Sequence, residues 1–344
     1  NVGTELTSTY SFGQYSNDGG VVSNSLTEVK ERNTAGFAEY EFAFGNFSAN
    51  AGLRYEHVKS NYYEAGIYQS GPSRRYADWF PSLSLAWQKG KWGVQGSYVC
   101  KIARPSYNWL RNEMQYDNRY FYEGGNPYLR PERVQSVSLS GSYSWLNAEV
   151  GYEYTKDKML WTATLYNGQD IGVSSNSNFD SHQYLYASLT ASPKFGWYQP
   201  TYELNFGCQH FETKDYSLDK NMNKPTVYFS LRNRFALPQD FNVDVNLNHN
   251  FGSYYGVNLV KPNTNLSLEL IKQFCHKTWT VNLYVNDLLK TNSSHTYTYG
   301  NHINLYISGY EFSRRLSLTV TYNFNASQSK YKGKGAGSGE KGRM

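Results

Sequence analysis

No run of about eighteen apolar residues occurs in the 344-residue sequence, so no segment could cross a bilayer as an α-helix. The start of the chain also lacks a basic segment followed by an apolar one, which would mark an export signal. We therefore expect any such signal to have been removed or truncated ahead of Asn1. On this interpretation the chain is the C-terminal portion of a longer exported protein.

Cysteine and histidine are few and widely spread. Cys100, Cys208 and Cys275 match no zinc-binding or redox spacing, and the seven histidines form no ligand pair. A disulfide between two of the cysteines stays open. Cys208 shares the parity of the apolar residues in its segment, so we expect it to face lipid.

Motifs that carry chemistry are also missing. The sequence has no nucleophile elbow, no HExxH motif and no glycine-rich phosphate loop. We therefore predict no catalytic residue, no metal site, no cofactor and no enzymatic activity. A site assembled from distant strands stays open as an alternative.

Charge is low and unevenly placed. Charged residues make up 18% of the sequence, and the net charge is +5. Most of this excess lies in residues 326–344, which hold four lysines and one arginine against a single glutamate. We predict that 326–344 is a disordered, basic, Gly/Ser-rich tail and that residues 1–325 form the folded domain. The rest of the chain has no basic stripe, so nucleic-acid binding is not expected.

What the sequence does have is alternation of apolar and polar residues with a period of two. Leu316 to Phe324 reads LSLTVTYNF, and the same pattern recurs at 47–56, 241–248 and 279–286. This period is typical of β-strands with one apolar and one polar face. Many long strands of this kind indicate a barrel that meets lipid on its outside and encloses a polar lumen.

The connections between these strands fall into two length classes. Short turns lie at 45–46, 88–91, 146–147, 192–196, 236–240 and 275–277. Long polar connections cover 12–33, 60–75, 104–131, 166–180, 212–224, 252–263 and 289–311. Outer-membrane barrels show this alternation, and it gives about fourteen strands, from near Thr4 to Phe324.

Aromatic residues on the apolar parity lie beside the short turns or the chain end, as expected of a girdle at a membrane interface. They are Phe44, Phe47, Trp87, Trp92, Trp145, Phe235, Phe241, Phe274, Trp279 and Phe324. We therefore predict an all-β fold, a transmembrane antiparallel up-and-down β-barrel of about fourteen strands. The alternative is a soluble β-sandwich or propeller, whose core would need apolar residues where this sequence has polar ones.

Several stretches resemble a known family. Arg104-Pro105-Ser106-Tyr107 is followed by GGNPYLRPE at 124–132, and VNDLL at 285–289 and RRLSL at 314–318 come later. In this order and spacing they resemble the outer-membrane β-barrel family close to the TonB-dependent receptors of Bacteroidetes. Val99-Cys100-Lys101 departs from the family pattern, in which a more polar run containing arginine is expected.

The resemblance implies an N-terminal plug and a TonB-contacting segment ahead of a barrel of about 22 strands. Fourteen strands would be the C-terminal part of that barrel, without the plug. It also implies location in the bacterial outer membrane and contact with the lipid bilayer. The TonB complex would be reached only through the missing plug, and the C-terminal strand would engage the barrel-assembly machinery.

We expect the connection 104–131 to carry the function. Its aromatic residues stand among Arg, Asn, Asp and Glu, a combination suited to binding a siderophore, a glycan or a peptide. The candidate ligand-binding residues are Tyr107, Trp109, Tyr116, Tyr120, Phe121 and Tyr122.

The end of the same connection has a structural role of its own. Its prolines fix φ and favour an extended chain, and its glycines permit a tight turn. The motif is expected to guide the chain out of the loop and into the strand 133–143. Its residues are Gly125, Asn126, Pro127, Leu129, Pro131 and Glu132.

We predict an outer-membrane receptor of the TonB-dependent type that takes up a nutrient ligand, here without its plug. The alternative is a complete passive channel or structural barrel, which an even number of fourteen strands would suit. A closed barrel leaves no free edge in lipid. We therefore expect the strand Thr4 to Phe12 to lie beside Leu316 to Phe324.

Overall fold

The computed structural model describes residues 1–17, 19, 22–211, 221–300, 303–310 and 312–323. The predicted tail 326–344 and the girdle residue Phe324 lie outside this part of the chain. The described residues form twenty strands. No helix among them is long and apolar enough to cross a membrane.

Fourteen strands follow one another across the main sheet. They are β1 (Val2–Tyr15), β2 (Ser25–Phe44), β3 (Phe47–Glu64), β4 (Ile67–Lys89), β5 (Trp92–Ala103), β8 (Glu132–Tyr143), β9 (Leu146–Leu165), β10 (Gly172–Ala191), β11 (Tyr198–Phe211), β12 (Thr226–Leu237), β13 (Phe241–Asn250), β16 (Asn263–Phe274), β17 (Trp279–Asn286) and β20 (Arg315–Tyr322).

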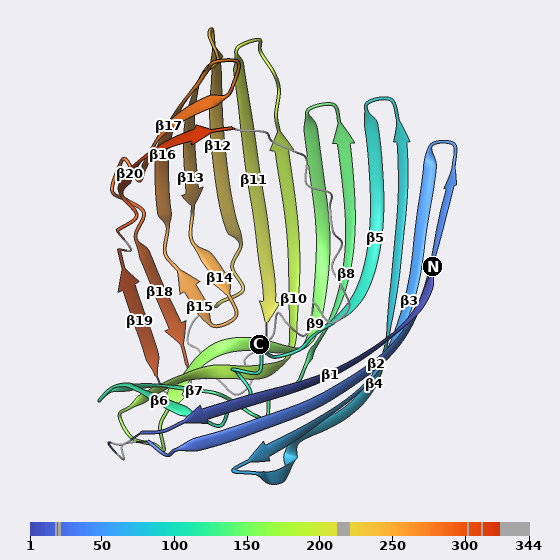
Figure 1. Ribbon diagram of the computed structural model, residues 1–344, viewed down its shortest axis with the longest axis vertical. Coiled ribbons are helices and arrows are strands. Elements are labelled where there is room, and N and C mark those ends of the chain that lie inside the picture. Colours follow the sequence, from blue (N-terminus) through green and yellow to red (C-terminus); the bar gives the residue numbers. More distant parts are fainter. Residues whose placement is uncertain (18, 20–21, 212–220, 301–302, 311, 324–344) are drawn as a thin grey trace.

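Each of these strands pairs antiparallel with the next one on the path. The predicted number of fourteen and the up-and-down order are confirmed. Figure 1 shows one strongly curved sheet with the short turns at the top and the long connections at the bottom.

The long connections carry the remaining strands. β6 (Met114–Asn118) and β7 (Phe121–Gly124) form a hairpin, and β7 also pairs with β10 in a parallel register. A separate four-stranded sheet joins β14 (Ser253–Tyr255), β15 (Asn258–Val260), β18 (Ser294–Tyr299) and β19 (Asn304–Gly309).

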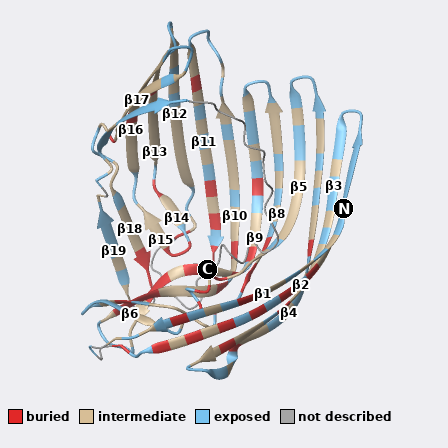
Figure 2. Ribbon diagram, in the orientation of Figure 1, coloured by how far each residue is buried: buried red, intermediate tan, exposed pale blue. Residues whose placement is uncertain are grey.

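The two faces of the main sheet differ as the alternation predicts. One row across four strands joins Val245, Leu268, Val285 and Leu316, and the neighbouring row joins Asp244, Glu269, Tyr284 and Ser317. Large apolar side chains are exposed along the first face, whereas the buried residues include many carboxylates and amides. Figure 2 shows exposed residues over much of the length of β1–β5 and β8, with buried ones concentrated toward the lower half of the molecule. A large apolar exterior over a polar interior suits a barrel wall in lipid.

The predicted aromatic girdle forms at the end with the short turns. Phe47 lies between Phe44 and Trp87 in register. The rings of Trp92 and Tyr143 have centroids 4.2 Å apart. At the far end of the sheet, Phe274 pairs with Trp279, whose ring lies 4.6 Å from that of Tyr322. Neighbouring strands therefore present their rings at one level.

The three cysteines are free. Cys208 lies on the exposed parity of β11, which it shares with Leu204 and Phe206. Its predicted outward position is confirmed.

The expectation that the first and last strands lie side by side is not confirmed. Among the described strands, β1 pairs with β2 alone and β20 pairs with β17 alone. Both strands are therefore edges of the sheet, with one row of backbone groups each that no described strand satisfies. In hydrocarbon, unpaired backbone groups cost several kcal/mol each.

A buried carboxylate holds the second sheet to the end of β17. Asp287 is fully buried and accepts hydrogen bonds from the backbone N–H groups of Thr291 and Asn292 at 2.9 and 3.1 Å. It also accepts from the hydroxyls of Tyr310 and Ser313 at 2.9 and 2.8 Å. Burial alone would raise the pKa of this carboxyl, but these hydrogen bonds outweigh burial and hold the pKa below its usual range.

Placing arginine on the two faces of one strand should have unequal costs. Leu283→Arg or Val245→Arg, on the apolar face, should destabilise the folded barrel by about 2–4 kcal/mol. Asn282→Arg or Asn246→Arg should cost much less, because these side chains lie on the polar face; the amide of Asn282 donates to Glu269 at 2.6 Å. Denaturant titration in lipid vesicles measures both sets. Equal costs would show that the faces are assigned wrongly.

Removing the charge of Asp287 should loosen the connection 289–311. We expect Asp287→Asn to lower the free energy of local unfolding of this connection by about 2 kcal/mol at neutral pH, because hydrogen bonds to a charged acceptor are lost. The folded-state pKa is lowered, so the stabilisation is present above the ordinary carboxyl pKa of about 4 and disappears as pH falls through the folded value. Hydrogen exchange of residues 289–300 measures the effect.

The control for this experiment is the exposed Asp240, in the turn at the opposite end of the wall. Asp240→Asn should leave exchange of 289–300 unchanged. Equal exchange in wild type and Asp287→Asn at neutral pH would contradict the role of the carboxylate.

Candidate functional site

The end of the wall opposite the short turns forms a mouth built from two folded loop bodies. One is the connection 104–131 with its hairpin β6–β7, and the other is the sheet β14–β15–β18–β19. Both lie in the lower half of Figure 1. Long connections without such structure would leave the lumen open at this end.

The connection 104–131 is fixed by an apolar cluster. Tyr107, Leu110 and Leu129 pack with residues of β2, β3 and β9, and Leu129 is completely buried. The hydroxyl of Tyr107 donates to Glu31 on β2 at 3.4 Å. The connection is therefore a packed part of the fold.

A chain of ion pairs ties the start of this connection to the polar face of the wall. Arg104 forms an ion pair with Glu56 and donates to the hydroxyl of Tyr76 at 2.8 Å. Glu56 also accepts from Arg54 at 2.5 Å, and Arg54 reaches Glu5 on the first strand at 3.0 Å. Because these charges are partly buried and alternate in sign, the network holds β1, β3 and β4 to the connection.

The Gly-Asn-Pro motif closes the connection through backbone contacts. A side chain at Gly125 would lie 2.1 Å from the carbonyl oxygen of Arg111, so only glycine fits there. Asn126 donates its backbone N–H to the carbonyl of Trp109 at 2.6 Å, and its side-chain amide donates to Asn176 at 3.0 Å. The motif therefore locks the connection against β10.

Glu132 anchors the beginning of β8. Its carboxylate accepts the backbone N–H of Met159 at 2.7 Å and the ammonium of Lys158 at 3.2 Å. Pro131 beside it is buried. Pro127 and Pro131 line a cavity of about 20 Å³ above β2–β4, which is about the size of one water molecule. These contacts fix the motif at the start of β8, and its guiding role stays a prediction.

The six candidate aromatic residues separate into two groups. Tyr107 and Tyr122 are buried, each inside an apolar cluster, so their rings stabilise the connection. Trp109, Tyr116 and Tyr120 are exposed at 42%, 41% and 60%. Phe121 is partly buried at the start of β7.

Tyr128 is not among the predicted ligand-binding residues, although it is 63% exposed; its ring lies against Gly71 of β4. Nothing in the local pattern distinguishes an exposed tyrosine from a packed one there.

The second loop body is anchored by a buried amide. Gln209 on β11 donates to the carbonyl of Gly256 at 3.1 Å and accepts the backbone N–H of the same residue at 2.7 Å. A ring nitrogen of His182 lies 3.1 Å from the Gln209 carbonyl oxygen. The side-chain amide of Gln209 thus pairs with both backbone groups of Gly256, at the tip of the β14–β15 hairpin, as a neighbouring strand would. An isolated glutamine gives no signal for this role in the sequence.

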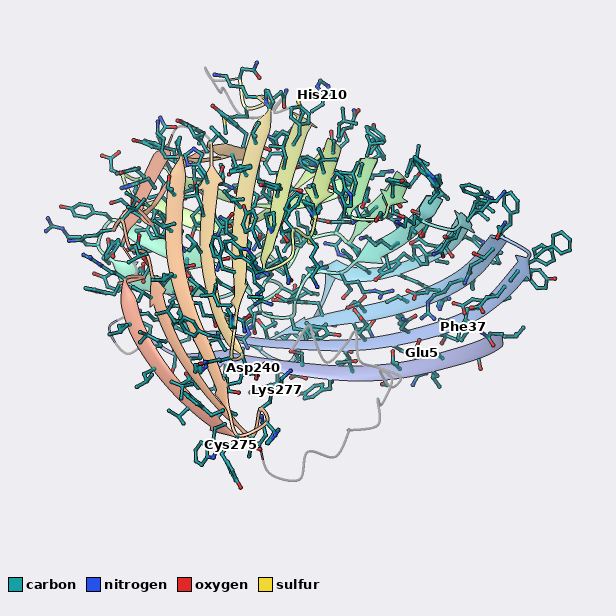
Figure 3. All side chains as sticks on the ribbon, turned by 90° about the horizontal axis from the view of Figure 1, so that it is seen from above. Glu5, Phe37, His210, Asp240, Cys275 and Lys277 are labelled. Atoms are coloured by element: carbon teal, nitrogen blue, oxygen red, sulfur yellow. The ribbon has the colours of Figure 1, made fainter. Side chains whose placement is uncertain are left out.

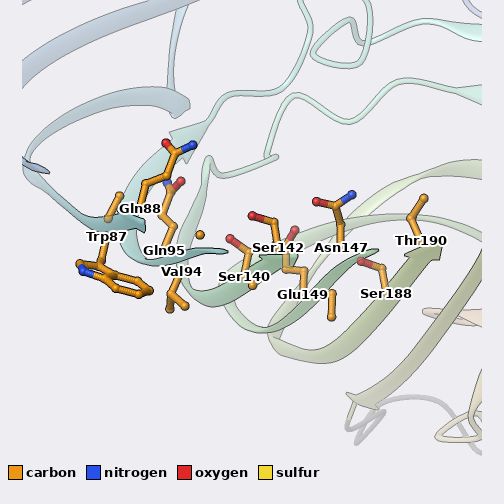
Figure 4. A pocket seen from close by; sticks show the side chains of 14 residues that line it. Trp87, Gln88, Val94, Gln95, Ser140, Ser142, Asn147, Glu149, Ser188 and Thr190 are labelled. Atoms are coloured by element: carbon orange, nitrogen blue, oxygen red, sulfur yellow. The ribbon is translucent and has the colours of Figure 1, made fainter. Parts of the chain in front are cut away.

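The lumenal face near the short turns is hollowed and polar. A concavity of about 510 Å³ is lined from β4 to β10 mainly by small uncharged polar side chains. Figure 4 shows Gln95, Ser140, Ser142, Asn147 and Ser188 along it. Figure 3, seen from above, shows the wall curving around the space that this face borders.

The described residues contain no group of three or more His, Cys, Asp or Glu side chains that could hold a metal ion. The ion pairs at the mouth involve arginines, lysines and carboxylates in structural positions. Trp109, Tyr116 and Tyr120 are the candidate aromatic residues whose side chains are exposed in this connection.

Solved structures of similar fold are outer-membrane receptors. The ferric yersiniabactin uptake receptor FyuA from Yersinia pestis matches with a TM-score of 0.60 at 16% identity, over 88% of this chain and 47% of its own. The FrpB iron transporter from Neisseria meningitidis matches with a TM-score of 0.55 at 16% identity, over 88% and 45%. The ferric-catecholate import receptor Fiu from K12 E. coli matches with a TM-score of 0.62 at 11% identity, over 94% and 52%.

At these identities the likeness shows the fold. The chain spans about half the length of the receptors it matches. No curated protein sequence matches it. The model of the outer membrane protein β-barrel family matches residues 2–322, almost the whole described chain. The chain therefore belongs to the outer membrane protein β-barrel family and is located in the bacterial outer membrane.

Proposed function

We propose that this chain is the C-terminal barrel portion of a TonB-dependent-type receptor that imports a nutrient ligand. The observation that carries the proposal is the mouth: two packed loop bodies present exposed aromatic rings above a polar lumen. Such rings with polar neighbours bind siderophores, glycans or peptides through their flat faces and their edges. The likeness to iron and siderophore receptors supports an import role.

The open edges of the wall support a larger barrel. β1 and β20 have no partner among the described strands. Further strands of the same protein, about eight in a barrel of 22, would satisfy both edges. A self-contained fourteen-stranded channel would need β1 to pair with β20, so the receptor is the better supported of the two functions.

The polar concavity near the short turns supports a domain inside the lumen. Its serine, asparagine and glutamine side chains offer donors and acceptors without a strong charge. In the proposed receptor a plug would sit against this face and would pass the pull of the TonB complex to the ligand. β20, as the last strand, would be the element recognised by the barrel-assembly machinery.

Replacing the exposed rings should weaken ligand binding without unfolding the barrel. We expect Trp109→Ala, Tyr116→Ala and Tyr120→Ala each to reduce uptake affinity about tenfold for the transported member of a probe set, since exposed anchors at an interface cost 1–2 kcal/mol or more. The probe set is a ferric catecholate, a ferric hydroxamate and an oligosaccharide, each radiolabelled, given to cells that express the full-length protein. Phe195→Ala, as exposed as Tyr120 at 59% but at the short-turn end, is the control.

Energy coupling separates the receptor from the passive channel. Uptake by a receptor should stop when the proton gradient is collapsed, and the purified full-length protein should not conduct ions in planar bilayers. Steady ion conductance, together with uptake that continues after the proton gradient is collapsed, would establish the passive channel instead.

A further inference from the structure

The outer face of the first four strands carries a row of cations in direct register. Ser8 pairs with Arg32, Arg32 with Lys59, and Lys59 with Arg75. All three cations are exposed. Their neighbours on the same strands, including Glu31 and Glu56, are buried on the opposite face. The strand register therefore places Arg32, Lys59 and Arg75 side by side on the exterior.

Within the described part of the chain, no carboxylate forms an ion pair with these three residues. The one acidic side chain nearby on this face is Glu28, which pairs with Lys30 at 3.3 Å and accepts from Tyr10 at 3.3 Å. Arg75 donates its Nε–H to a ring nitrogen of His57 at 3.1 Å, which leaves its charge uncompensated. The row is therefore a patch of unbalanced positive charge.

Such a row is costly in the protein alone. Side chains directly opposite each other on antiparallel strands have Cβ atoms about 4.5–5.5 Å apart, and like charges there repel. An external anion that bridges the cations would convert the repulsion into attraction. The adjacent cations therefore favour binding of a multivalent anion.

The position of the row relative to the membrane identifies that partner. Phe47 belongs to the girdle at the short turns, and Tyr55 lies about 26 Å farther along the same strand. The Tyr55 ring lies 4.8 Å from that of Trp79, which is 61% exposed. Because barrel strands are tilted by about 35–45°, this separation corresponds to about 20 Å along the membrane normal, within an apolar band about 25 Å tall.

Lys59 lies about 13 Å beyond Tyr55 along the strand, which at the same tilt is about 10 Å along the membrane normal and puts it about 30 Å from the level of Phe47. The row therefore stands just outside the aromatic level of Tyr55 and Trp79, at the height of the lipid headgroups of the outer leaflet. It faces away from the mouth and the lumen, so a transported ligand would not meet it.

We propose that Arg32, Lys59 and Arg75 form a binding site for the phosphate groups of a phosphorylated glycolipid in the outer leaflet. The two guanidinium groups supply paired N–H donors for phosphate oxygens, and Lys59 between them supplies a point charge. The acyl chains of the same lipid pack on the apolar face below Tyr55 and Trp79. This site fixes the barrel in its lipid surroundings and is independent of any transported ligand.

The test measures lipid binding by the purified full chain in a zwitterionic detergent. The probes are lipid A with two phosphates and the same lipid with both phosphates removed. The triple variant R32Q/K59Q/R75Q should bind the phosphorylated probe about 100-fold more weakly, since each cation near a lipid surface contributes about fivefold. The dephosphorylated probe should bind wild type and triple variant equally weakly.

The matched control is K89Q/K91Q, which removes two exposed cations at the short-turn end and should leave lipid binding unchanged. The triple variant should also unfold at a higher temperature in the absence of lipid, because the repulsion is gone. The single variant K59Q, at the centre of the row, should lose about fivefold if the triple variant does not fold.

Unchanged affinity of the triple variant, or of K59Q in its place, would overturn the proposal. So would equal binding of the phosphorylated and dephosphorylated lipids to wild type. Displacement of the lipid by an equal concentration of inorganic phosphate would assign the row to a soluble anion and would equally overturn a lipid site.

Discussion

Every part of this structure depends on the need to satisfy backbone N–H and C=O groups where water is absent. A strand in hydrocarbon must find partners on both sides, so the chain runs up and down through fourteen strands with each one paired to the next along the path. The short turns at one end keep neighbouring strands in sequence next to each other in space. Pairing to the next strand along the chain therefore sets the register of both faces.

That register places apolar side chains on the outside of the barrel wall and polar ones on the inside, the reverse of a soluble protein. On the inner face, carboxylates and guanidinium groups neutralise one another across strands, as in the run from Glu5 through Arg54 and Glu56 to Arg104. These pairs are only partly buried, so their value lies in holding the connection 104–131 at one place above the lumen. The loops of the mouth are held to the wall by such pairs and by apolar clusters.

The outer face follows a different logic. Lipid tails pack against any apolar side chain, so the apolar band requires no specific side-chain packing. The position of the barrel in the membrane is set instead by the two levels of aromatic residues and by the charged residues beyond them. The same strands thus present the partly buried ion pairs on the inner face and the row of Arg32, Lys59 and Arg75 on the outer face. The alternation of side chains keeps these two surfaces apart although they are one residue apart in sequence.

The sequence by itself determined the wall. Period-two alternation, two classes of connection and aromatic residues beside the short turns gave the strand number, the direction of each face and the level of one girdle. These signals are local, because a strand's faces are fixed by its own residues and a short turn fixes its neighbour. The role of the Gly-Asn-Pro run as a stiff guide into β8 stays a prediction.

Only the tertiary structure decided the rest. Tyr107 and Tyr122 resemble Tyr116 and Tyr120 in sequence, yet the first two are buried and the second two exposed. Burial depends on where the connection meets the wall, since Tyr107 packs with residues of β2 and β9 and Tyr122 with Val173 of β10. Arg104 finds Glu56 across forty-eight residues, and Lys59 meets Arg32 and Arg75 only through the registers of two hairpins. That β1 and β20 each have one partner among the described strands likewise follows from the curvature of the whole sheet. Contacts between segments distant in sequence depend on register and chain path, which no local pattern encodes.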